Sequence, residues 1–343
     1  MCLNPFLNIQ IHSDGSVVPC CPAFTSAGFV SSRRNTGAYT FGNIFDQPFH
    51  DIWYSKQAAD FRRSVIDNSY RFCDLQLCNE RITAHAGMSG KEFFAGRFDQ
   101  NGMLKYPAYI LSSLDNTCNV QCIFCRQHRY VMPKEKIARL NSMIDSYFVP
   151  MFKDAVRLGV SGGGECLAST FERNLLAAVC AKFPSIQVGF LTNGLLCDEK
   201  NVQQLGILDN LRDITVSLHA ATAETYNQII HHSNFERVME NVKYLADLKK
   251  RGKLQRVQIS FVVTAINYRE MKAFLALAIK LDIIASFWSM HGGPFSKNEI
   301  RELSVWQPQH PQYADFCYLL NDEIFASSHC QMNPEIAAAR NKN

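Results

Sequence analysis

Six short apolar segments within residues 109–290 alternate with longer stretches in which apolar residues recur at helical spacing. The segments are 109–114, 157–161, 188–191, 214–218, 257–263 and 283–290. Strands that alternate with helices in this way form a parallel sheet with crossover helices. Ser233 and Asn267 are each followed three residues later by glutamate, which is the pattern of a capping box at a helix start. The order of segments predicts an α/β fold.

Three cysteines, Cys118, Cys122 and Cys125, follow the first apolar segment at spacings of four and three residues. Three thiolates at this spacing can bind three irons of a cubic 4Fe–4S cluster and leave the fourth iron without a protein ligand, whereas ferredoxin-type clusters take four cysteines. A structural zinc site is an alternative, because His128 follows Cys125 by three residues and supplies a fourth ligand type. Chance clustering is another alternative in a chain with 13 cysteines.

Three more motifs follow in chain order, each at the end of an apolar segment. They are Gly162-Gly163-Gly164-Glu165, Thr192-Asn193-Gly194, and the pair Ser217 and His219. With the cysteines they resemble the radical S-adenosylmethionine (SAM) superfamily. The resemblance implies that SAM ligates the open iron and that the glycines and Glu165 hold its methionyl ammonium. It also implies that Ser217 contacts the ribose or carboxylate of SAM, and that Thr192, Asn193 and His219 belong to the same site. For the glycine run alone, a plain strand-to-helix turn is the alternative.

The resemblance carries a fold and a chemistry with it. It implies a partial (β/α)6 TIM-like barrel, in which ligands bind at the carboxyl ends of the strands. It implies an enzyme in which a flavodoxin- or ferredoxin-type donor reduces the cluster, SAM is cleaved to a 5′-deoxyadenosyl radical, and this radical abstracts hydrogen from a substrate.

The first hundred residues have a different character, with cysteines among loops rich in Gly, Pro, Asn and Ser. Residues 9–18 read as a hairpin around Asp14-Gly15, which brings Cys2 and Cys20 toward the same end. This region resembles the SPASM or twitch domain, which carries auxiliary 4Fe–4S clusters and normally follows the barrel. The resemblance implies one auxiliary cluster bound by Cys2, Cys20, Cys73 and Cys78. Cys21 is the alternative to Cys20, and a zinc knuckle or free thiols are the alternatives to the cluster.

Composition excludes several classes of protein. A net charge of +4 with no basic run interleaved with aromatics gives no reason to expect nucleic-acid binding. No run of 18 apolar residues and no signal-peptide pattern is present, so we expect no membrane span and a cytoplasmic location. We expect an auxiliary domain over 1–105, the barrel over 106–292 and a C-terminal extension over 293–343.

The substrate is the point at which hypotheses diverge. The first is dehydrogenation or epimerisation of a small polar molecule such as a sugar or aminocyclitol, because a single auxiliary cluster resembles the twitch-type dehydrogenases. The second is maturation of a peptide or protein, the commonest role of SPASM proteins. The third is a non-catalytic iron–sulfur or zinc protein. An epimerase needs a hydrogen-donating thiol, for which Cys166 and Cys197 are the candidates by position, although a structural role is the expectation for each.

Overall fold

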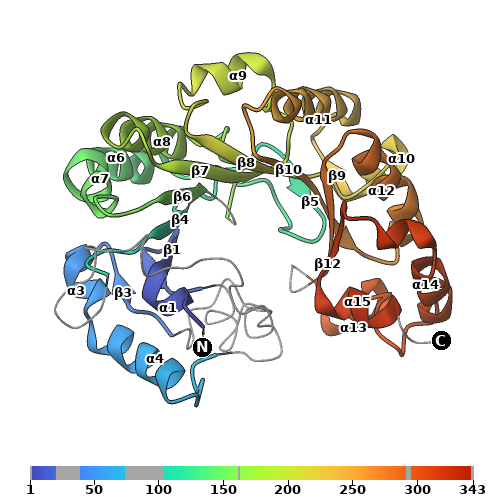
Figure 1. The fold of residues 1–343 in the computed structure, drawn as a ribbon, viewed down its shortest axis with the longest axis horizontal. Helices are drawn as coiled ribbons and strands as arrows, with labels where there is room; N and C mark the ends of the chain where they lie inside the picture. Colours follow the sequence, from blue (N-terminus) through green and yellow to red (C-terminus); the bar gives the residue numbers. More distant parts are fainter. Residues whose placement is uncertain (1, 21–38, 74–103, 161–162, 291–294, 341–343) are drawn as a thin grey trace. The chain divides into compact units, whose positions relative to one another are not determined.

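The computed structural model describes residues 2–20, 39–73, 104–160, 163–290 and 295–340. The chain forms two compact units, one made of Met1–Asn116 and Met132–Gly189 and the other of Thr117–Val131 and Phe190–Asn343. The chain passes from the first unit to the second within strand β7 (Gln187–Thr192). Figure 1 labels most of the helices and strands of the two units, which are described separately below.

In the first unit, a sheet with the order β6-β4-β1-β2-β3 carries helices in its connections. Its strands are β1 (Asn8–His12), β2 (Ser16–Val18), β3 (Gly42–Asn43), β4 (Tyr109–Ser113) and β6 (Arg157–Val160). Its helices are α1 (Asn4–Leu7), α3 (Phe49–Trp53), α4 (Lys56–Ile66), α6 (Lys134–Ser142), the π-helical turn η2 (Ile144–Phe148), α7 (Val149–Met151) and α8 (Thr170–Lys182). The pairs β1–β4 and β4–β6 are parallel, and β1–β2 and β2–β3 are antiparallel.

The hairpin predicted around Asp14-Gly15 is confirmed. β1 and β2 pair through Gln10 with Val18 and Ile11 with Val17. Gly15 closes the turn at φ +85°, a conformation that favours glycine because it has no Cβ, and its amide donates to the carbonyl of His12 at 2.8 Å.

The same hairpin is part of the main sheet, which the cysteine pattern of this region did not predict. β1 pairs in parallel with β4 along its whole length, from Asn8 opposite Tyr109 to His12 opposite Ser113. Ile9 and Ile11 on one face of β1 are buried with Ile110 of β4. The N-terminal segment therefore shares a hydrophobic core with the first strand of the predicted α/β region.

In the second unit, a sheet with the order β12-β11-β10-β8-β7 continues the alternation of strands and helices. Its strands are β8 (Leu211–Ser217), β10 (Arg256–Val263), β11 (Ile284–Ser289) and β12 (Cys330–Met332), and a separate pair is formed by β5 (Gln121–Cys122) and β9 (Ile230–His231). Its helices are α9 (Glu199–Gln204), α10 (Ala223–Ile229), α11 (Phe235–Lys250), η3 (Tyr268–Glu270), α12 (Met271–Lys280), α13 (Lys297–Leu303), α14 (Tyr313–Leu320), η4 (Glu323–Ala326) and α15 (Pro334–Arg340). Helix α11 packs on β10 and α12 packs on β11 (Figure 1).

The predicted α/β class is confirmed, since the six predicted apolar segments correspond to β4, β6, β7, β8, β10 and β11. Both predicted capping boxes are wrong in detail. Helix α11 is capped by Asn234, whose side chain accepts from the amide of Arg237 at 2.8 Å, and the hydroxyl of Ser233 bonds Tyr226 instead. Asn267 uses its side chain to accept from the amide of Thr264 at 2.8 Å, because it precedes a short 3-10 turn and not an α-helix start.

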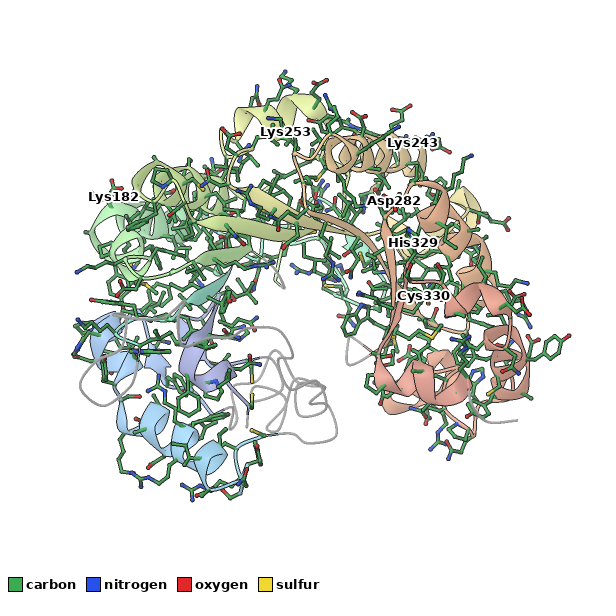
Figure 2. The ribbon with its side chains drawn as sticks, in the orientation of Figure 1. Lys182, Lys243, Lys253, Asp282, His329 and Cys330 are labelled. Carbon is green, nitrogen blue, oxygen red and sulfur yellow. The ribbon has the colours of Figure 1, made fainter. Side chains whose placement is uncertain are left out.

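The C-terminal segment contributes a strand that matched no motif. β12 pairs in parallel with β11, through Cys330 opposite Ala285 and Met332 opposite Phe287. Just before it, His329 lies beside Asp282 (Figure 2), with 3.0 Å between the His329 Nε2 and the Asp282 Oδ1. Across the described residues, no helix has both the length and the apolar character needed to cross a bilayer.

Candidate functional site

The predicted cluster cysteines lie on a segment of the second unit that backbone hydrogen bonds fix at three points. Cys118 donates its amide to the carbonyl of Tyr130 at 2.9 Å, and Cys122 lies in β5, opposite Ile230 of β9. The amide of Cys125 donates to the carbonyl of Cys122 at 3.1 Å, which closes a turn between the last two cysteines. Cys118 and Cys122 are half-buried and Cys125 is exposed, so all three thiols reach the surface of this unit.

The chemistry of these thiols bears on which metal group they would hold. In the described part of the chain, no three His, Cys, Asp or Glu side chains converge on one point as ligands of a single metal ion must. A zinc ion needs every sulfur about 2.3 Å from the same point. Thiolates of a 4Fe–4S cluster each bind a different iron and lie farther apart. Three thiolates, one for each of three irons, would suit a cluster whose fourth iron has no protein ligand.

Asn193, from the turn after β7, meets the first of these cysteines. Its side-chain amide lies 3.9 Å from the Sγ of Cys118 and donates to the Oδ1 of Asn119 at 2.8 Å, while its own Oδ1 accepts from the amide of Leu195 at 3.0 Å. Two motifs separated by some seventy residues in the sequence thus touch within one unit. Hydrogen bonds to cluster sulfurs raise the reduction potential of iron–sulfur centres, so this amide is placed to influence a cluster on Cys118.

Thr192 has a local role in the same turn. Its hydroxyl accepts from the amide of Gly194 at 3.0 Å and from the thiol of Cys197 at 3.5 Å. Thr192 is 2% exposed and Cys197 is fully buried. Cys166 is likewise buried, so neither candidate thiol for hydrogen donation is exposed at the surface of its unit.

His219 packs against the cysteine segment as a neutral imidazole. Its ring stands edge-on to that of Phe124, which lies between Cys122 and Cys125, with 4.8 Å between ring centroids. Its Nδ1 accepts from the amide of Val262 at 3.1 Å, so the proton of the neutral ring is on Nε2. Burial lowers the pKa of His219 to about 3, and its backbone is left-handed at φ +61°.

Ser217 ends β8 and begins a row of polar side chains that crosses four parallel strands. It lies opposite Ser260 of β10, which lies opposite Ser286 of β11, which in turn lies opposite Gln331 of β12. Residues paired in register project to the same face of a sheet. The hydroxyl of Ser217 is half-buried and forms no hydrogen bond with any described residue. Of this row, the sequence analysis identified only Ser217. The polar residues at positions 256, 258 and 260 of β10 alternate with apolar ones and could have predicted that one face of this strand is polar.

In the first unit, Gly163 lies against Asn116, and a Cβ at this position would be 1.8 Å from the Asn116 Oδ1. Gly164 is half-buried, while Glu165 is 1% exposed and accepts from the amide of Leu167 at 3.3 Å. Gly162 lies outside the described residues. The close contact explains why a glycine is needed at position 163.

Glu172, which the sequence analysis missed, holds the end of β4 where the chain leads to the cysteines. Its carboxylate accepts from the hydroxyl of Ser112 at 2.8 Å and from the amides of Leu114 and Asp115 at 3.2 and 3.3 Å. Burial raises the pKa of Glu172 to about 7, with a further rise from the nearby Asp115 carboxylate. Ser169, the N-cap of α8, donates to the Asp115 Oδ2 at 2.7 Å and completes the support.

Of the predicted auxiliary-cluster ligands, Cys2, Cys20 and Cys73 are half-buried in the first unit, and Cys78 and Cys21 lie outside the described residues. Cys20 lies two residues after the end of β2. Cys2 lies before α1, which leads directly into the start of β1, so both cysteines belong to the open end of the hairpin. Cys73 is held by a turn in which its amide donates to the carbonyl of Tyr70 at 2.9 Å. These thiols would supply three of the four cysteine ligands that such a cluster takes.

The second unit also contains a cavity of about 360 Å³ at the amino ends of β10, β11 and β12. Asp282 lies in its wall between Lys249 and His329, and its carboxylate is 2.7 Å from the Lys249 Nζ. Hydrogen bonds from Lys249 and His329 lower the pKa of Asp282 to about 2. The cavity lies at the opposite ends of these strands from Ser217 and His219, where ligands of parallel β/α folds do not ordinarily bind.

Two family models match the chain. The iron–sulfur cluster-binding domain named SPASM matches residues 2–79, and the radical SAM superfamily matches residues 113–278. The predicted order, with the auxiliary domain in front, is therefore confirmed. These domains imply SAM, a 4Fe–4S cluster and auxiliary iron–sulfur chemistry as cofactors.

Named relatives match about half of the chain. A "Probable GTP 3′,8-cyclase" of Saccharolobus islandicus (strain Y.N.15.51 / Yellowstone #2) is 30% identical over 178 residues, which are 50% of this chain and 53% of the relative. A GTP 3′,8-cyclase of Clostridium acetobutylicum is 25% identical over 189 residues, or 52% of this chain and 55% of the relative. The chain thus spans about half the length of the curated relatives it matches. A solved structure of native anSMEcpe with bound AdoMet aligns with a TM-score of 0.46 and 18% identity, covering 66% of this chain and 63% of the other.

Proposed function

Because this chain belongs to the radical SAM superfamily and carries a SPASM domain in front of the radical SAM domain, we propose that it cleaves SAM reductively and oxidises or isomerises a small polar substrate. When bound, the cluster supplies one electron to SAM, whose cleavage gives a 5′-deoxyadenosyl radical that takes hydrogen from the substrate. Cys118, Cys122 and Cys125 would hold the cluster, and Cys2, Cys20, Cys73 and Cys78 a single auxiliary cluster. A flavodoxin- or ferredoxin-type electron donor and a cytoplasmic location stay predictions.

The contact between Asn193 and Cys118 carries this proposal, because a motif attributed to SAM binding reaches the cysteine segment. Glu165, Gly162, Gly163 and Gly164 would bind the amino-acid part of SAM, and Thr192 would shape the turn that presents Asn193. His219 would act as an uncharged packing group beside the cysteines, since its imidazole stays neutral above about pH 3. Ser217 has a free hydroxyl for the ribose or carboxylate of SAM.

The substrate class rests on the polar row that starts at Ser217. Ser260 and Ser286 are uncharged groups that both donate and accept hydrogen bonds, and Gln258 donates to the Ser286 hydroxyl at 2.6 Å. Ser260 and Ser286 are buried, whereas Ser217 at the start of the row is half-buried, so its hydroxyl is the group placed to meet a ligand. An uncharged hydroxyl suits a hydroxylated, uncharged ligand such as a sugar or aminocyclitol. A nucleoside triphosphate is the second candidate, because relatives over half the chain are named as GTP 3′,8-cyclases. A peptide substrate remains the third.

The test is anaerobic reconstitution followed by measurement of iron and of 5′-deoxyadenosine. We expect about eight irons per chain from two four-iron sites. A Cys118→Ala/Cys122→Ala/Cys125→Ala variant should lose half of the iron and all SAM cleavage, whereas Cys330→Ala, a half-buried thiol outside both sets, should lose neither. SAM cleavage by the triple variant would refute the proposal. Turnover with deuterated sugars, GTP or peptides, followed by transfer of deuterium into 5′-deoxyadenosine, would then identify the substrate class.

A further inference from the structure

Ser13, at the turn of the β1–β2 hairpin, binds residues on both sides of the cysteine segment. Its hydroxyl oxygen accepts from the side-chain amide of Asn116 at 2.7 Å, and its carbonyl accepts from the Nζ of Lys136 at 2.8 Å. Asn116 immediately precedes the segment 117–131, and Lys136 lies in the first turn of α6, five residues beyond that segment. Ser13 therefore binds one residue just before the cysteine segment and one shortly after it, and both of these residues belong to the first unit.

The side chain of Asn116 has a second neighbour that matters for SAM. Its Oδ1 occupies the space that a Cβ at Gly163 would need, so the glycine turn lies against one end of the amide group and the hairpin is bonded to the other. The backbone before Asn116 is fixed as well, since Glu172 accepts from the amides of Leu114 and Asp115. The side chain of Asn116 thus lies between Ser13 and Gly163, next to a stretch of backbone that Glu172 holds.

The opposite end of the hairpin carries the proposed auxiliary ligands. β1 has five residues, which span about 17 Å at roughly 3.4 Å per residue. Ser13 follows the last residue of β1, while Cys20 lies two residues beyond β2 and Cys2 precedes β1 by way of α1. The hairpin thus joins a proposed auxiliary cluster at its open end to Asn116 at its closed end.

We propose that the β1–β2 hairpin is a coupling element through which the auxiliary-cluster region sets the SAM affinity of the radical SAM site, with Ser13 and Asn116 as its positioning residues. The inference rests on the proposed function, because it assumes that Gly163 and the cysteine segment serve SAM. Loss of the bond between Ser13 and Asn116 removes one restraint on the amide that lies against Gly163 and on the start of the cysteine segment. SAM binding must then order these groups again, which weakens it.

The experiment is a SAM titration of the reduced protein followed by EPR, with iron content measured on the same samples. Ser13→Ala should raise the Kd for SAM about fivefold, the effect of one net hydrogen bond, while iron content stays normal. Ser13→Thr keeps the hydroxyl and should restore the wild-type Kd. Ser16→Ala is the matched control, because the Ser16 hydroxyl donates to Asp14 within the same turn and not to the cysteine segment.

Coupling is tested with two further variants. Asn116→Ala should raise the Kd at least as much as Ser13→Ala, and the double variant should be no weaker than Asn116→Ala alone, because both changes break one interaction. Cys73→Ala should lose about four irons, as expected for one four-iron site, and should also weaken SAM binding. A Ser13→Ala Kd equal to that of Ser16→Ala, or additive effects in the double variant, would overturn the coupling. Wild-type protein whose EPR signal does not respond to SAM would instead refute the proposed function.

Discussion

The side-chain amide of Asn193 lies 3.9 Å from the Sγ of Cys118, so the turn after β7 supports the cysteine segment within one unit. The same side chain is fixed at both of its ends, by Asn119 and by the amide of Leu195. Because both ends of the side chain are hydrogen-bonded, its rotamer is fixed before a cluster binds. It can therefore act on the cluster's electronic properties through one N–H donor.

Asn193→Asp should lower the midpoint potential of the cluster on Cys118. Aspartate keeps the oxygen that accepts from Leu195 but replaces the N–H donor with a negative charge, which disfavours the reduced and more negative cluster. Loss of one hydrogen bond alone corresponds to ~40 mV, and the charge adds to it. Redox titration followed by EPR measures the shift. Asn321→Asp, the same charge change at an exposed position after α14, should leave the potential unchanged. An equal potential in both variants would contradict the role of Asn193.

Ser217→Ala should weaken SAM binding without loss of iron. The hydroxyl of Ser217 is half-buried and has no described partner, so its removal leaves no unsatisfied protein group and only the ligand loses a contact. One such hydrogen bond corresponds to about a fivefold change in Kd. Glu165→Ala should weaken SAM binding further, because it removes a carboxylate from a buried position. SAM titrations followed by EPR measure both effects, and Ser328→Ala at an exposed serine is the control. Unchanged affinity in both variants would mean that the barrel motifs are misassigned.

Local patterns were sufficient to predict the strands and the hairpin. The apolar segments that became β4, β6, β7, β8, β10 and β11 depend on spacing within a few residues, as does the turn at Asp14-Gly15. The pairing of β1 with β4 was not predictable in this way, since its partners are about a hundred residues apart and nothing in either segment specifies the other. The same is true of β12, which is three residues long and has no alternation to reveal it.

In the candidate site, the residues of the motifs were predicted from the sequence, whereas a residue that holds the backbone next to them was not. Asn193 and His219 were predicted from their motifs, and both contact residues of the cysteine segment. Glu172 was missed because it stands three residues after Ser169, where a glutamate ordinarily serves as part of a capping box. Its carboxylate turns inward to the end of β4 instead. Only the tertiary structure shows that choice.

Glu172 should make the first unit less stable as pH rises through neutrality. Its pKa is raised to about 7 in the folded chain, against 4.5 when exposed, so its protonated form is favoured by folding. The resulting stabilisation is full below pH 4.5 and is lost as pH rises toward and past 7. Between pH 5.5 and 7.5 the loss is about 2 kcal/mol. Glu172→Gln mimics the protonated side chain and should remove this dependence. Hydrogen exchange of amides near β4, measured at both pH values, tests it, and an equal pH dependence in both proteins would contradict the assignment.

His219 should give the second unit the opposite dependence. Burial lowers its pKa from 6.5 to about 3, so folding favours the neutral ring. The stabilisation is full above pH 6.5 and is lost as pH falls toward 3, a loss of about 1 kcal/mol between pH 7.5 and 5.5. His219→Asn suits the test because asparagine tolerates the left-handed backbone and its oxygen can accept from Val262. In this variant, the free energy of local opening of β8 and β10, obtained from exchange rates corrected for the intrinsic effect of pH, should no longer fall on acidification. The Glu172→Gln protein is the matched control, since its β8 and β10 should keep the wild-type response. A wild-type response in His219→Asn would show that the buried imidazole does not control the acid stability of this unit.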